Sequence, residues 1–344
     1  MDGSELTNKA MKMKPNLKIS AFIMVFLLSI TNANAVASKI EFIPNPNEAP
    51  QITLQKAFGG SVSSSSAIDS TEDCTKDGLN HLNIVEDDLF PYALSITQHG
   101  DIDLDCNSKN LNDQLERSRY EVKVPRPNKG NESLSQVLYE NETSIWSIDL
   151  KLAKDFILPK HQENLLFQHI IQAKPREPRD LSKAAKDLIN DKLEPRLRVS
   201  ILRDMENGRD ILKLRLNATD DAGQFRILNE QILVDFNNPT KDLRGKWLKV
   251  QLLAVWSNNG RVDYTLSEYT SATETKQIVH LIQEDIDLWD NVWSEIYFKA
   301  GLYAGRVAVT DKRGKTVMKN GKIVYKTGIP TNTIYFNRIE LDKR

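Results

Sequence analysis

The chain of 344 residues has little of several features that mark common protein classes. It has one long apolar run, residues 19–30, and no second one, so we expect no membrane span in the mature protein. Its 46 basic and 47 acidic residues leave a formal net charge of −1, which argues against a general nucleic-acid binder. Its five histidines show no metal-ligand spacing, and no glycine-rich phosphate loop is present. These absences disfavour zinc enzymes, nucleotide-binding enzymes and membrane proteins.

Only two cysteines occur, Cys74 and Cys106. In an oxidising compartment such a pair more often forms a disulfide than a metal site. We therefore expect a Cys74–Cys106 disulfide, with two free thiols as the alternative.

The first residues predict export from a bacterial cell. Three lysines between positions 12 and 18 precede the apolar run, and the small-residue segment TNANAVA follows it. A basic region, a short apolar region and an A-x-A cleavage site are typical of a secretory signal peptide, with an uncleaved anchor as the alternative. We expect residues 1–35 to be removed and the mature protein to be secreted or periplasmic.

The rest of the chain predicts a linker followed by one large domain. Residues 36–73 contain PNPNEAP, which reads as extended linker, and the serine-rich segment SVSSSSAIDSTED. Residues 74–344 are assigned to a single all-β domain. Alternating polar and apolar residues predict strands at 117–124, 144–152, 163–174, 195–203, 210–217, 245–257, 261–268, 315–327 and 332–342.

Turn and helix signals complete this pattern. Asn207-Gly208 and Asn320-Gly321 are strong hairpin turns. Residues 179–191 have the spacing of a short amphipathic helix, and residues 275–289 are a second helix candidate. Many strands with few helices predict a β-sandwich of two antiparallel sheets, one curved, in the jelly-roll manner, with one or two short helices in loops.

The segment YFKAGLY, residues 297–303, has two different faces when it is extended. One face carries polar side chains and a glycine gap: Tyr297, Lys299, Gly301 and Tyr303. The other face is apolar: Phe298, Ala300 and Leu302. The glycine would let a large ligand lie against the backbone.

Other predicted strands also carry a charged face. These positions are Arg117, Arg119, Glu121 and Lys123, then Arg196, Arg198 and Ser200, and then Lys213 and Arg215. If such strands are neighbours on a concave sheet, they line a groove suited to an extended polyanion. The alternative is a solvated outer sheet face.

YFKAGLY resembles the YFKAG-x-Y strand of the jelly-roll polysaccharide lyases, a concanavalin A-like group that includes alginate lyases, glucuronan lyases and, more loosely, heparin lyase I. RYE (119–121) resembles the Arg-x-Glu strand of that family, and FQHIIQ (167–172) resembles its Gln/His strand. IYFNRIELD near the C-terminus resembles its closing strand. The resemblance runs from about residue 100 to the C-terminus. It implies β-elimination on a polysaccharide that contains uronic acid.

The resemblance also implies roles for named positions. Tyr303 corresponds to the catalytic tyrosine, as general acid and, in one alternative, as base too. Arg119 is the candidate to neutralise the substrate carboxylate, with Glu121 orienting it. The other candidates contact the sugar chain: Tyr297, Lys299, Gln168, Lys123, Arg196 and Arg198.

His169 is the candidate base, but its position is ambiguous. It directly follows Gln168, so a regular strand would send the two residues to opposite faces. Then Gln168 would face the groove and His169 the core. In the alternative Phe167 takes the glutamine position and His169 faces the groove, and a bulge could reconcile both. His99 and His161 are the fallback bases.

Other functions remain as alternatives. A non-catalytic carbohydrate-binding β-sandwich could use the same face. A glycoside hydrolase would need two paired carboxylates, and the segment EDIDLWD lacks the final glutamate of the E-x-D-x-x-E signature. We expect a monomer that binds an anionic polysaccharide, and neither nucleic acid nor membrane after signal cleavage. No cofactor is required, and a structural Ca²⁺ at the acidic loop EDDL (86–89) is left open.

The lysine-rich segment 311–322 is a further predicted hairpin. It would either extend the positive potential of the groove or protect an edge strand from pairing, and we favour the second interpretation.

Overall fold

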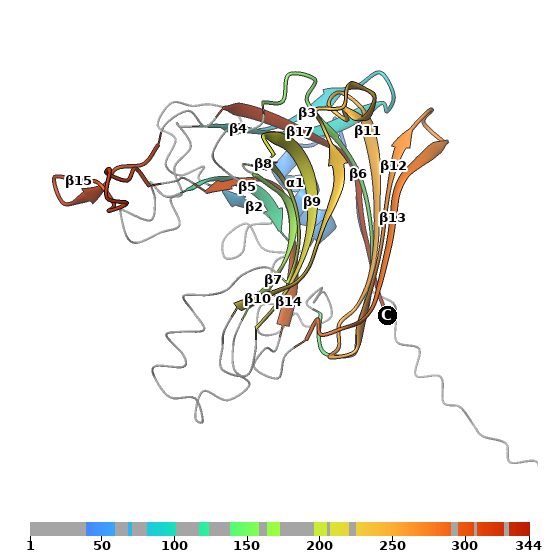
Figure 1. Cartoon of the computed structure of the whole chain (residues 1–344). Helices are drawn as coiled ribbons and strands as arrows, with labels where there is room; N and C mark the ends of the chain where they lie inside the picture. The colour runs from blue at the N-terminus through green and yellow to red at the C-terminus, as the bar shows by residue number, and fades with distance from the viewer. Residues whose placement is uncertain are drawn as a thin grey trace, which may run out of the picture. The chain divides into compact units, whose positions relative to one another are not determined.

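Two antiparallel sheets pack against each other and bury the apolar residues that alternate along their strands (Figure 1). The computed structural model describes residues 39–58, 68–70, 81–100, 117–123, 138–157, 164–172, 196–204, 207–219, 225–289, 295–305, 308–326 and 330–344. Within these ranges only the backbone is described at 68–70, 117–120, 123, 164–165, 167–172, 204, 218–219, 225–226, 295–297 and 304–305. Residues 36–344 form one compact unit.

The first sheet has the strand order β13-β12-β11-β6-β17-β4-β3, and β1 also pairs with β17. Its strands are β1 (Lys39–Phe42), β3 (Leu82–Glu86), β4 (Tyr92–His99), β6 (Thr143–Leu152), β11 (Trp247–Val255), β12 (Gly260–Tyr269), β13 (Thr275–Ile286) and β17 (Thr331–Lys343).

The second sheet has the strand order β10-β9-β8-β7-β14-β5-β2. Its strands are β2 (Ile68–Ser70), β5 (Arg117–Lys123), β7 (Asn164–Gln172), β8 (Leu197–Asp204), β9 (Arg209–Thr219), β10 (Phe225–Asp235) and β14 (Glu295–Gly305). A separate two-stranded sheet joins β15 (Met318–Lys319) to β16 (Lys322–Ile323). The fold class expected from the sequence, an all-β jelly-roll sandwich, is confirmed.

The core lies between the two sheets. Trp146 of β6 stacks on Phe298 of β14, with the ring centroids 3.9 Å apart, so the two sheets meet at this pair. Both side chains are 1% exposed. The apolar residues of the alternating pattern that predicted the strands are therefore those on the side of each strand that faces this core.

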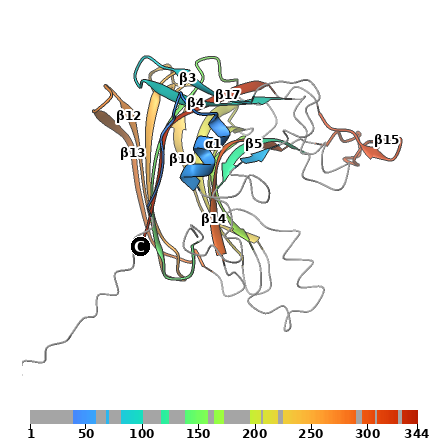
Figure 2. The ribbon, with the colours of Figure 1, turned by 180° about the vertical axis from the view of Figure 1, so that it is seen from behind.

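The segment expected to be an extended linker contributes to the core (Figure 2). β1 pairs with β17, and α1 (Pro50–Phe58) follows it. Leu54 and Phe58 share one face of α1 because they are four residues apart, and both are buried. Phe58 stacks on Phe42 of β1, with the centroids 6.2 Å apart. Proline favours the first turn of a helix, so the proline that ends PNPNEAP begins α1.

The second helix candidate is wrong, because residues 275–286 form strand β13. β13 pairs with β12 through nine register positions between Gly260 and Tyr269. The apolar residues of this segment are largely β-branched, which favours an extended backbone, and β12 supplies the hydrogen-bonding partner. The helical elements of the described residues are α1 and the 3-10 helix η2 (Pro239–Lys241).

Four sequence predictions fall outside the described residues: the signal peptide, the Cys74–Cys106 disulfide, the helix at 179–191 and the position of His161. None of the helices in the described part of the chain is both long and apolar enough to cross a membrane.

Candidate functional site

The YFKAGLY segment forms the middle of β14, which lies between β7 and β5 in the second sheet. Its apolar face is buried in the core: Phe298 is 1% exposed, and Ala300 and Leu302 are fully buried. The opposite face carries Lys299, which is buried, and Tyr303, which is partly buried. The two-faced strand expected from the sequence is therefore present.

Gly301 lies at a β-bulge between these two polar side chains. The pairing of β14 with β7 shifts between Ala300 and Tyr303, so two residues of β14 oppose one of β7. The φ angle of Gly301 is 149°, in the region that favours glycine. The glycine thus sets the backbone geometry that presents Tyr303 after the bulge.

A row of polar positions crosses six strands of the second sheet. Paired residues of antiparallel strands lie on the same face of a sheet, so the register can be followed from strand to strand. From β10 to β5 the paired positions are Glu230, Arg215, Arg198, Gln168, Lys299 and Lys123. We call these six positions the basic row.

A second row of paired positions, two to four residues from the basic row on each strand, contains Tyr303. From β9 to β5 its paired positions are Lys213, Ser200, Leu165, Tyr303 and Arg119. Between the two rows, Glu121 pairs with Gly301. The fold thus brings the predicted positions Tyr303, Lys299, Arg119, Gln168, Glu121, Lys123 and Arg198 to one region of one sheet.

The charged side chains of this face are unusually buried. Lys299 and Lys213 are each 4% exposed, Arg198 is 8% exposed and Glu121 is fully buried. The Nζ atom of Lys299 lies 3.9 Å from Oε2 of Glu121. Burying a charge costs several kcal/mol before its partners compensate, so a fold rarely concentrates charges without a functional reason.

The described charges of the two rows, together with Glu121 between them, are mainly positive. Four cations, Arg198, Lys213, Arg215 and Lys299, face two carboxylates, Glu121 and Glu230, which leaves a net charge of +2. The whole chain has a net charge of −1. This face therefore carries a local positive charge that the overall composition does not reveal, and such a face attracts polyanions.

Glu230 of the edge strand β10 binds two of these cations. Its Oε2 accepts from Nε of Arg215 at 2.6 Å, and its Oε1 lies 3.2 Å from Nζ of Lys213. Burial alone would raise the pKa of Glu230, but the hydrogen bonds from Arg215 and Lys213 outweigh it and lower that pKa. One carboxylate thus occupies a site formed by two cations.

The register places His169 opposite Phe298 on β14 and Leu197 on β8, both of which have buried core side chains. Gln168 instead pairs with Lys299 and Arg198. The irregularity in this part of β7 lies between Leu165 and Phe167, before both residues. Gln168 and His169 therefore take opposite sides of the sheet, as in the first of the two arrangements expected from the sequence.

The remaining predicted positions lie near the same face. Tyr297 pairs with Ile170, two residues before Lys299 on β14. Arg196 precedes β8 and is 1% exposed, and its Nη1 donates to the carbonyl of Asn217 at 3.3 Å. That contact joins Arg196 to the end of β9. The fallback base His99 belongs to β4 of the first sheet, where its ring lies against His81 with centroids 4.5 Å apart.

Two groups of the site were absent from the predicted site residues. Lys213 and Arg215 lie on a polar strand face that the sequence does show, but only the register places them beside Arg198. Glu230 belongs to β10, a strand that the alternation did not predict. An acidic residue that faces two lysine or arginine positions across a hairpin is the signal that could have found it.

The acidic loop 86–89 was considered for Ca²⁺. Asp87 accepts from Nε1 of Trp247 at 2.7 Å and from the ammonium of Lys151. Within the described ranges, no group of three or more His, Cys, Asp or Glu side chains is arranged to hold a metal ion.

No family model and no curated protein matches the chain. Among solved structures, the endo-β-1,4-glucuronan lyase from the fungus Trichoderma reesei aligns with a TM-score of 0.44 and 14% identity, over 81% of this chain and 95% of that chain. A marine alginate lyase from Aplysia kurodai aligns with a TM-score of 0.45 and 9% identity, over 89% and 98% of the two chains. The carbohydrate recognition domain of Emp46p aligns with a TM-score of 0.40 and 8% identity, over 87% and 94%. All three TM-scores are below 0.5, and all three identities are below 25%.

Proposed function

We propose that the chain is a polysaccharide lyase that cleaves a uronic-acid-containing polyanion by β-elimination. The observation that carries the proposal is the juxtaposition on one sheet face of Tyr303, Lys299 and the paired positions Arg119 and Gln168. This set supplies a proton-transfer group beside cations and an amide, which is what elimination next to a carboxylate requires.

Elimination begins at the C5 carbon of the uronic acid, whose proton is only weakly acidic. Arg119, Gln168 and Lys299 bind the neighbouring carboxylate, which stabilises the negative charge that develops when the proton leaves. The phenolate of Tyr303 takes the C5 proton, and the positive charge of this sheet face favours that anionic form. The C4–O bond then breaks, a C4–C5 double bond forms, and the Tyr303 phenol returns the proton to the leaving glycosidic oxygen.

In this mechanism Tyr303 carries both proton transfers. His169 is not assigned the base, because its register position is opposite the core residues Phe298 and Leu197. The cations of β8 and β9, Arg198, Lys213 and Arg215, extend the binding surface along the polymer. Tyr297, two residues before Lys299 on β14, and Lys123, at the β5 end of the basic row, add substrate contacts.

The test is the ultraviolet absorbance of the new C4–C5 double bond, followed over time with a panel of uronic-acid polysaccharides. We expect absorbance to rise with one polymer and Tyr303→Phe to lower kcat by about 10²- to 10⁴-fold, the usual contribution of a positioned acid or base. Tyr335→Phe is the matched control, because Tyr335 belongs to β17 of the other sheet. It should leave kcat unchanged.

Each other outcome decides a different point. An equal rise in Tyr303→Phe would retain the lyase and remove Tyr303 from the mechanism. Tight binding of one polymer without any rise would replace the proposal by a non-catalytic carbohydrate-binding protein. The N-terminal residue and the two cysteines of the mature protein test the expected export. A chain that begins at residue 36 or 38 and contains a Cys74–Cys106 disulfide would fit a secreted enzyme.

A further inference from the structure

A small basic module follows β14 directly in the chain. Residues 308–326, here called the lysine hairpin, contain β15 and β16 and two tight turns. Ala308 pairs with Tyr325 and Thr310 with Thr316, and the amide of Val317 donates to the carbonyl of Val309 at 2.8 Å. Three short segments thus hold one another by backbone hydrogen bonds.

The lysine hairpin carries a high positive charge. Six cations occur in these 19 residues, against the single acid Asp311, which gives a net charge of +5 in a chain whose net charge is −1. The six cations are Lys312, Arg313, Lys315, Lys319, Lys322 and Lys326. All are exposed except Lys326, which is partly buried.

The one acid does not neutralise these cations. Oδ1 of Asp311 accepts from the backbone amides of Arg313 at 2.8 Å and Lys315 at 2.9 Å. This carboxylate therefore shapes the turn that ends at Gly314, whose φ angle is 75°. Within the described residues, none of the six cationic side chains forms an ion pair.

Several exposed cations of the sandwich are instead paired with acids. Lys56 pairs with Glu48, Arg261 with Glu284 at 2.9 Å, and Arg344 with Asp342 at 2.9 Å. Neighbouring acids thus offset these three positive charges. The lysine hairpin leaves its charges available to an external anion.

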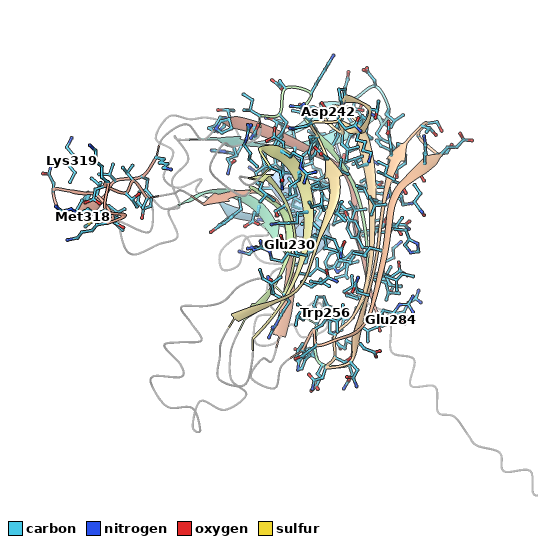
Figure 3. The ribbon with its side chains drawn as sticks, viewed as in Figure 1. Glu230, Asp242, Trp256, Glu284, Met318 and Lys319 are labelled. Carbon is cyan, nitrogen blue, oxygen red and sulfur yellow. The ribbon has the colours of Figure 1, made fainter. Side chains whose placement is uncertain are left out.

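The lysines do not protect an edge strand of either large sheet. Among the named strands, β15 and β16 pair only with each other and not with an edge of either large sheet. In the described part of the chain, the hairpin contributes no residue to the hydrophobic core, and Met318 is 53% exposed. Figure 3 labels Met318 and Lys319 on this hairpin. Its charge therefore serves neither the core nor an edge of the two large sheets.

The chain connection ties the first residue of the hairpin to the candidate site. Tyr303 and Ala308 are five residues apart, so their Cα atoms lie at most about 18 Å from each other. The base of the hairpin, at Ala308, therefore lies within reach of a polymer bound at Tyr303.

We infer that the lysine hairpin is a second binding site for a polyanionic polysaccharide, which holds the part of the chain that extends beyond the catalytic face. The inference rests on the proposed function for the identity of the polymer, but not for the binding itself. Exposed cations act on a polyanion without specific geometry, so the binding should weaken steeply with salt.

The test compares three variants in the full-length mature protein. Lys315→Gln/Lys319→Gln/Lys322→Gln removes three charges from the hairpin. Lys154→Gln/Lys241→Gln/Lys276→Gln removes three exposed charges from elsewhere and is the matched control. Lys315→Arg/Lys319→Arg/Lys322→Arg keeps the hairpin charge and controls for packing.

Affinity is measured by electrophoresis in gels that contain alginate, polyglucuronate or heparin, at several salt concentrations. We expect the hairpin Gln variant to bind the preferred long polymer about tenfold more weakly at low salt, with a smaller dependence on salt, and a tetrasaccharide equally well. The control and the Arg variant should bind as the unmodified protein does. The hairpin Gln substitutions should lower the affinity for the long polymer about tenfold in a Tyr303→Phe protein as well. That result would support binding at the hairpin even if no polymer is cleaved.

Equal long-polymer affinity in the hairpin Gln variant and the matched control would overturn the inference. So would an equal loss with the tetrasaccharide, which would place the effect at the catalytic face. Hairpin-dependent binding to vesicles with anionic phospholipids, but to no polysaccharide, would also overturn it.

Discussion

Lys299 and Glu121 are buried neighbours on adjacent strands, with Nζ and Oε2 3.9 Å apart. Because Glu121 is fully buried, water cannot hydrate its carboxylate when the ammonium is removed. We predict that Lys299→Met lowers the free energy of unfolding by about 3 kcal/mol. Urea unfolding at constant m-value measures this change.

Lys213→Met is the matched control for that prediction. Lys213 is also buried, but its partner Glu230 is 38% exposed and can be hydrated when the lysine is removed. Lys213→Met should lower the free energy of unfolding by less than about 1 kcal/mol, apart from the change in packing that both variants share. Equal losses of unfolding free energy in the two variants would show that burial of the partner carboxylate does not determine the size of the effect.

Gly301→Ala should disturb the site through the backbone. A φ angle of 149° is strained for any residue with a Cβ atom, and the strain falls on the bulge that precedes Tyr303. We predict a stability loss of about 1–3 kcal/mol together with a lower kcat. Thermal unfolding and initial rates on the preferred polymer measure the two effects.

Gly208→Ala separates the two effects. Gly208 also has a positive φ angle, 62°, and no atom lies within 4 Å of an added Cβ. It lies in the turn between β8 and β9, away from Tyr303 in the register. This variant should lose about 1 kcal/mol of stability and keep its kcat. A normal kcat in Gly301→Ala would show that the bulge does not position Tyr303.

Local patterns in the sequence predicted most strands of the sandwich. The segment 144–152 became β6, Thr143–Leu152, because alternate side chains enter one core. Asn207-Gly208 predicted the β8–β9 hairpin because a tight turn of this kind needs a positive φ angle. The YFKAGLY strand was predicted for the same reason as β6.

Long-range pairing decided the features that the sequence left open. The side of the sheet taken by His169 depends on where β7 is irregular against β8 and β14. β10 was missed because its pairing with β9 shifts twice, at Ile227/Asn229 and Ile232/Val234, which breaks the two-residue period. Glu230 was missed with it, although it binds two cations of the site.

Glu230 gives a prediction with a defined pH dependence. Its pKa is lowered in the fold, so its carboxylate stabilises the protein above the ordinary value of 4.5, and this contribution disappears as the pH falls through the lower folded pKa. Because the side chain is 38% exposed, we predict that Glu230→Gln lowers stability by less than about 1 kcal/mol at pH 7. The difference from the unmodified protein should vanish in acid, as measured by urea unfolding across pH.

The same substitution should strengthen polyanion binding. Without the carboxylate, Lys213 and Arg215 are available to a carboxylate or sulfate of the polymer, and we predict about 3- to 10-fold tighter binding at low salt. Glu284→Gln is the matched control, because Glu284 pairs with Arg261 on the other sheet and both glutamates are labelled in Figure 3. It removes the same charge, so any general gain from net charge will appear in both variants. An equal gain in the two would show that Glu230 does not compete with the polymer for these two cations.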